Sequence, residues 1–96
     1  MPQLALPRSL DIAAVTTVAA ELVHALAVGE LTIDAGAVVK IDAAGLQLLC
    51  AAAHHARVSG AKLDWKNLPA VLEDGARTLA LTDALGWPIK RSQEDR

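Results

Sequence analysis

The residues best placed to do chemistry include an aspartate that precedes an expected helix. Asp42 stands directly before Ala43-Ala44-Gly45 and a long Ala- and Leu-rich segment. A carboxylate at such a position accepts hydrogen bonds from the amides of the first helical turn. The small side chains after it leave the positive helix end open to a partner's backbone or to an anion. Two interpretations follow: Asp42 and Gly45 belong to a recognition surface, or they only cap and pack the helix.

A second aspartate, Asp34, follows the apolar run Leu31-Thr32-Ile33 and precedes the small-residue stretch Ala35-Gly36-Ala37. At the carboxyl edge of a parallel sheet it can join Asp42 in an acidic cation site. The alternative, which we favour, is that Asp34 anchors the loop after it through hydrogen bonds to backbone amides.

Residues for catalysis or metal binding are sparse. The three serines (Ser9, Ser59 and Ser92) have no histidine at a recognisable spacing, and no glycine-rich phosphate-binding motif is present. His54 and His55 are adjacent, so on a helix they point about 100° apart and do not bind one metal ion together. We therefore expect no enzymatic activity, no metal and no other cofactor.

The composition describes one small, helix-rich domain. Of the 96 residues, 53% are hydrophobic, with 20 alanines and 15 leucines, whereas the only aromatic residues are two tryptophans. A net charge of −2 and the lack of aromatic stacking platforms argue against nucleic-acid binding. The single cysteine, Cys50, excludes an intrachain disulfide and is expected in the core. Without a long apolar run or a signal-peptide pattern, we expect a cytoplasmic protein that does not insert into a membrane.

The elements that position these residues alternate between strand and helix. Hydrophobic periodicity, N-cap residues and terminating glycines predict strands at 3–6, briefly at Leu10, at 31–34 and at 61–66, and helices at 12–28, 43–59, 69–79 and 82–85. In the first long helix the spacing predicts a buried stripe of Ile12, Val15, Ala19, Leu22 and Leu26. In the second it predicts a core side of Leu46, Leu49, Ala53 and Ala56.

This order predicts an α/β fold with a mixed sheet of about four strands flanked by helices. We expect one domain over residues 1–89 and a polar C-terminal tail over 90–96.

Residues 31–49 carry a more specific pattern. A strand that ends in Asp is followed by a small-residue loop, and then by Asp-small-small-Gly-Leu at the start of a helix. This pattern resembles the STAS domain family, and the resemblance extends from about residue 4 to residue 87. The family includes anti-sigma-factor antagonists and stand-alone MlaB-like proteins, the small STAS subunits of lipid-transport ABC systems. The resemblance implies a STAS-like fold and a non-catalytic protein–protein interaction module of signal transduction in bacteria.

In phosphorylatable members of the family, the residue after this Asp is a Ser or Thr that a partner kinase phosphorylates. Here that position is Ala43 and the next is Ala44, so we expect no phosphoacceptor at this site. The implied partner-binding residues lie in the loop and at the helix start: Ala35, Gly36, Asp42, Ala43, Ala44, Gly45 and Gln47. Trp87, which lies between Gly86 and Pro88, is a further interface candidate.

Several partners are compatible with the resemblance. An anti-sigma factor or sensor kinase comes first, by similarity to the antagonists. The alternatives are the ATPase of a lipid-transport ABC system, a chemotaxis signalling cluster, and a small nucleotide or lipid ligand. Self-association through an alanine-rich helix face, giving a homodimer, also stays open.

Overall fold

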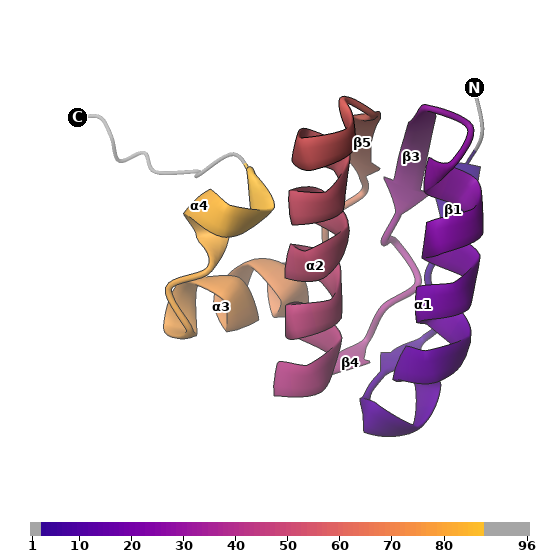
Figure 1. Ribbon diagram of the computed structural model, residues 1–96. Helices are drawn as coiled ribbons and strands as arrows, with labels where there is room; N and C mark the ends of the chain where they lie inside the picture. Colours follow the sequence, from indigo (N-terminus) through magenta and orange to yellow (C-terminus); the bar gives the residue numbers. More distant parts are fainter. Residues whose placement is uncertain (1–2, 88–96) are drawn as a thin grey trace.

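Five strands and four helices alternate along residues 3–87, the part of the chain that the computed structural model describes (Figure 1). In chain order they are β1 (Gln3–Ala5), β2 (Ser9–Leu10), α1 (Ile12–Leu26), β3 (Glu30–Asp34), β4 (Lys40–Ile41), α2 (Ala43–Ser59), β5 (Lys62–Lys66), α3 (Ala70–Thr78) and α4 (Thr82–Leu85). The predicted elements are confirmed, with small shifts at their ends, and the structure adds β4. The predicted tail at 90–96 and the domain boundary at residue 89 lie outside the described residues.

The strands form a three-stranded sheet in the order β1-β3-β5 and a separate pair, β2-β4. Every pairing among residues 3–87 is parallel. Parallel neighbours need a crossover connection, and α1 lies between β1 and β3 in the chain, as α2 lies between β3 and β5. The predicted α/β class is confirmed. In place of the expected mixed sheet of about four strands, the five described strands pair only in parallel, and β2 and β4 form a pair apart from the main sheet. The two-residue strand β4 is too short to recognise in the sequence.

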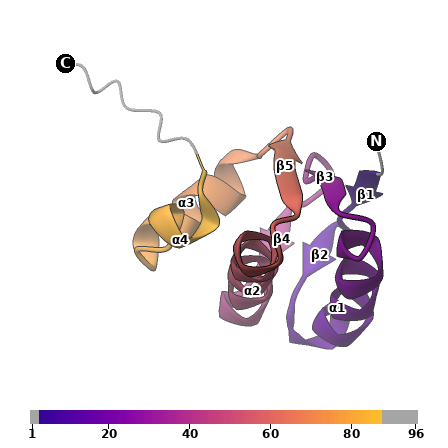
Figure 2. The same ribbon diagram turned by 45° about the horizontal axis from the view of Figure 1, so that its top comes forward.

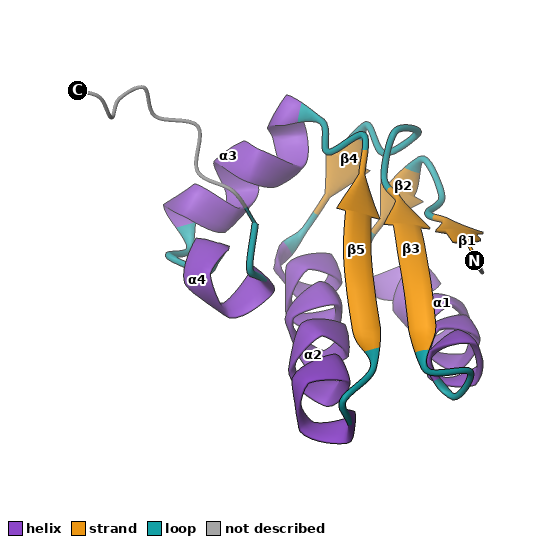
Figure 3. Cartoon of the chain, turned by 90° about the horizontal axis from the view of Figure 1, so that it is seen from above, coloured by secondary structure: helices purple, strands orange, loops and turns teal. Residues whose placement is uncertain are grey.

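One face of the three-stranded sheet is covered by α1 and α2, which both lie behind the strands in Figure 3. Leu31 and Ile33 of β3 belong to the alternating set on this face and are fully buried. Glu30, Lys62 and Lys66 belong to the opposite set and are exposed. The helices therefore cover one face of this sheet, and the other face is polar.

Both long helices begin at an aspartate, as predicted. Asp11 Oδ1 accepts hydrogen bonds from two first-turn amides of α1, at 3.1 and 3.2 Å. Asp42 Oδ1 accepts one from the amide of Gly45 in α2, at 2.9 Å. Gly60 ends α2 with a φ of 79°, a left-handed conformation that costs glycine little. The sequence signals at both ends of α2 are thus confirmed.

The predicted buried stripe of α1 is wrong at its first residue. Ile12 is 74% exposed, and the buried residues of this helix are Val18, Leu22 and Leu26. Val15 and Ala19 are only partly buried. Periodicity gives the face of a helix but not how far the neighbouring elements extend, and the first turn of α1 lies at one end of the molecule (Figure 1).

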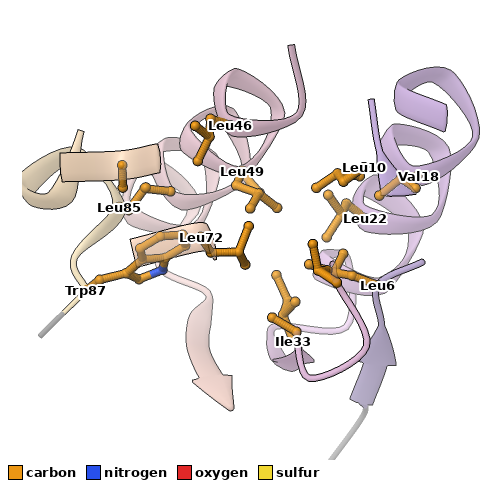
Figure 4. Close-up of a cluster of buried hydrophobic side chains, with 14 of the residues drawn as sticks. Leu6, Leu10, Val18, Leu22, Ile33, Leu46, Leu49, Leu72, Leu85 and Trp87 are labelled. Carbon is orange, nitrogen blue, oxygen red and sulfur yellow. The ribbon is translucent and has the colours of Figure 1, made fainter. Parts of the chain in front are cut away.

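Helix α2 is the central element of the helical layer. It contacts α1 on one side and α3 and α4 on the other (Figure 1), and its predicted core residues are all buried. Figure 4 shows Leu49 of α2 between two groups of side chains, one with Leu10, Val18 and Leu22, and the other with Leu72, Leu85 and Trp87. Both halves of the core therefore depend on α2. None of the described helices is long and apolar enough to cross a membrane.

Leu49→Ala measures this dependence. Because Leu49 is fully buried between the two halves of the core, the change should lower the free energy of unfolding by about 2–5 kcal/mol. Val58→Ala on the same helix is the control, since Val58 is 73% exposed and its truncation should cost less than about 0.5 kcal/mol. Urea denaturation of both variants gives the two values, and similar losses would contradict the central place of Leu49.

Candidate functional site

The loop after β3 is held by a carboxylate. Asp34 Oδ1 accepts hydrogen bonds from the amide of Gly36 at 2.9 Å and from Asn67 Nδ2 at 3.1 Å. The bond from the Gly36 amide, followed by that from Asn67, holds the pKa of Asp34 below its usual value. Since Asn67 directly follows β5, Asp34 joins the loops that leave two neighbouring parallel strands. This confirms the interpretation of Asp34 as a loop anchor.

Asp42 makes one contact that the sequence predicted and one that it did not. Besides the bond from Gly45 to Oδ1, its Oδ2 accepts a hydrogen bond from the amide of Ile12 at 3.1 Å. Ile12 is the first residue of α1, so the carboxylate caps the starts of both long helices. The hydrogen bond from Gly45, with a further contribution from Ile12, lowers the pKa of Asp42. No local pattern reveals a bond between residues thirty positions apart.

The seven predicted binding residues divide by exposure. Gly36, Asp42, Ala43 and Gln47 are exposed, Ala44 is partly buried, and Ala35 and Gly45 are buried. The exposed members lie at two places: Gly36 is in the loop after β3, next to Asn67, and the other three are at the start of α2. We take the two places together as the candidate surface. Ala35 and Gly45 position this surface and do not offer area to a partner.

Gly45 is buried because α2 presses against the backbone of β2. A Cβ atom at Gly45 would lie 2.2 Å from the carbonyl oxygen of Leu10 and 3.0 Å from side-chain carbons of Leu10 and Ile41. Real Cβ atoms do not approach a carbonyl oxygen this closely, so only glycine allows the contact. Figure 2 shows the short pair involved, with β2 beside α1 and β4 beside α2.

Two exposed apolar side chains near this surface were missed in the sequence. Ile12 is 74% exposed, and its amide binds Asp42 directly. Val39 is 58% exposed and lies three residues before Asp42, where its amide donates a hydrogen bond to the carbonyl of Arg8 at 2.8 Å. The helical periodicity had placed Ile12 in the core. Val39 follows Val38, which is buried, and nothing in the sequence distinguishes the exposed valine from the buried one.

Trp87 has a different position from the one its neighbours in sequence suggested. It is 4% exposed and lies near Leu72 in the core (Figure 4). Its ring packs edge-on against Trp65, with the ring centroids 5.3 Å apart. Its side chain fills the space between α4, β5 and the rest of the core, which is why it has no area to offer a partner. We therefore leave Trp87 out of the candidate site.

The remaining chemical groups do not converge. His54 and His55 are exposed on α2, while Cys50 is partly buried, and burial raises the pKa of its thiol. Among residues 3–87 there is no group of three or more His, Cys, Asp or Glu side chains placed to hold a metal ion. Around the two capped helix starts the exposed residues are Ile12, Asp42, Ala43 and Gln47.

A comparison with known families agrees with this arrangement. The sequence model of the family described as "Mlab, STAS domain" matches residues 1–86. The chain belongs to the STAS domain family. No curated protein matches the chain closely enough to add a relative. STAS domains are in general non-catalytic modules for protein interaction or regulation, and the parallel sheet with its covering helices is compatible with the STAS fold.

Gly45→Ala tests the close approach of α2 to β2 in this STAS domain. The added methyl group meets the backbone of Leu10, which cannot rotate away, so we expect the free energy of unfolding to fall by about 1–3 kcal/mol. Gly75→Ala in α3 is the matched control, because a Cβ there meets side-chain carbons and no backbone; the nearest is a terminal methyl carbon of Leu46, at 3.1 Å. Thermal denaturation compares the two variants, and an equal or greater loss in Gly75→Ala would contradict the argument.

Proposed function

We propose that this STAS domain binds a protein partner through the start of α2 and the loop before it. The observation that carries the proposal is the exposure of Ile12, whose amide binds the carboxylate of Asp42, the residue before Ala43. Val39, in the loop before α2, is exposed as well. A large exposed apolar side chain next to small residues offers a partner area to bury. The small helix start lets a partner's backbone come close, and the exposed apolar groups supply area to bury.

The partner that we favour is the ATPase subunit of a lipid-transport ABC system. The support comes from the matched family, whose description names the MlaB type of STAS domain. An anti-sigma factor or sensor kinase is the second candidate, by the resemblance of residues 31–49 to the antagonists. In their phosphorylatable members a hydroxyl follows the aspartate, whereas here Ala43 and Ala44 provide none. That difference favours a partner whose binding does not depend on phosphorylation of this chain.

Ala43→Glu tests the surface. A carboxylate in the first turn of α2 faces the positive end of the helix, so stability should hold or rise by about 0.3–1 kcal/mol. At an interface the same unpaired charge must be desolvated, which should weaken binding by about 2–5 kcal/mol, or roughly 30-fold or more. Isothermal titration calorimetry against the purified ATPase subunit from the same genome gives the affinity, and circular dichroism gives the thermal midpoint.

Val58→Glu is the control for this experiment. Val58 is exposed near the other end of α2, about 22 Å from Ala43 at the rise of an α-helix, so the charge should leave the affinity unchanged. Equal affinities for the parent and Ala43→Glu would place the binding surface elsewhere. Titration of a purified anti-sigma factor in parallel decides between the two partners.

The lack of a hydroxyl at the start of α2 gives a separate prediction. Incubation with ATP and a serine kinase that acts on other STAS domains should leave the parent protein without phosphate at this site. Ala43→Ser, which restores the hydroxyl at the family position, should gain one phosphate. Intact-mass spectrometry followed by peptide mapping reads the result, and a phosphate on Ser9 or Thr16 of the parent would contradict a phosphorylation-independent module.

A further inference from the structure

A single carboxylate joins the starts of the two long helices. Asp42 Oδ1 binds the amide of Gly45 in α2, and its Oδ2 binds the amide of Ile12 in α1. Asp11, the N-cap of α1, uses Oδ1 for the amides of Ala13 and Ala14. The first amide of α1 is thus bound by Asp42, a residue of another element.

The geometry around Asp42 keeps this bond in place. The two helices start at the same end of the molecule and run side by side (Figure 1). The backbone amide of Asp42 donates a hydrogen bond to the carbonyl of Leu10 at 3.3 Å, two residues before Ile12. Gly45 lets α2 approach that same carbonyl. The carboxylate therefore lies between two positive helix ends, which both favour its negative charge.

We propose that Asp42 is a positioning residue that holds Ile12 beside the start of α2, so that the partner contacts α1 as well as α2. This rests on the proposed function. Ile12 is the most exposed large apolar side chain of the described residues and follows the residue that caps α1. Fixing its backbone amide to Asp42 orders an apolar group before the partner arrives, which lowers the entropic cost of binding. Asp42 then acts on affinity through Ile12.

The chemistry of the carboxylate allows a selective test. An Asn side chain has one acceptor oxygen in place of two, so Asp42→Asn can cap Gly45 or Ile12 but not both. Asp11→Asn is the matched control, because Asp11 uses a single oxygen and Asn is an equally good N-cap. We expect Asp42→Asn to raise the hydrogen-exchange rate of the Ile12 amide at least tenfold while Gly45 stays protected. Asp11→Asn should leave both rates unchanged.

This NMR measurement needs no partner. It therefore tests whether Asp42 joins the two helix starts even if the ATPase does not bind. Unchanged exchange rates of both the Ile12 and the Gly45 amides in Asp42→Asn would overturn the inference, because an Asn that keeps one bond must release the other. Asp42→Ser is the second variant, since its shorter hydroxyl can cap Gly45 in the manner of other N-caps but reaches less far toward Ile12.

The effect on binding is measured with the same ATPase subunit. Asp42→Asn and Ile12→Ala should each weaken binding about tenfold, and the double variant should bind no more weakly than Ile12→Ala alone. If Asp42 has only a structural role, the losses of affinity in Asp42→Asn and Ile12→Ala should multiply in the double variant. That result would overturn the inference. If Ala43→Glu abolishes binding and Ile12→Ala leaves it unchanged, the inference fails while the proposed function stands. If neither variant changes the affinity, the proposed function fails.

Discussion

The close contact between the start of α2 and the backbone of β2 is the constraint on which the rest of the structure depends. A Cβ at Gly45 would lie 2.2 Å from the carbonyl oxygen of Leu10, so the distance between the two elements is set by the lack of a side chain. At this distance Asp42 reaches Ile12, and the starts of α1 and α2 share one carboxylate. Gly45, which has no side chain, thus determines where the carboxylate of Asp42 and the amide of Ile12 lie.

The small residues of α2 have a related effect on the core. Gly45, Ala52, Ala53 and Ala56 are buried along this helix, and they let neighbouring elements pack close on more than one side. The larger side chains, such as Leu49, then fill the space between α1 and the α3–α4 segment. The opposite side of α2, with His54, His55 and Val58, stays exposed.

The carboxylates of Asp34 and Asp42 both bind groups of the domain itself. Asp34 binds the loop amide of Gly36 and the side chain of Asn67, and Asp42 binds two helix starts. Hydrogen bonds to the ionised form lower the pKa values of both groups. The negative charges therefore stabilise the loop and the helices. Ile12 and Val39 are exposed, and in our proposal they contact the partner.

The sequence by itself determined the α/β class, the order of the elements, both aspartate N-caps and the glycine that ends α2, because these follow from local hydrogen bonding and periodicity. The tertiary structure alone decided which members of those patterns are exposed. Ile12 fits the periodicity of a buried stripe, yet it lies at the end of the molecule where no neighbour covers it. Trp87 follows a helix end that suggests a surface position, yet it packs against Trp65 in the core. Burial and the bond from Ile12 to Asp42 depend on residues distant in the chain, and a local pattern carries no information about them.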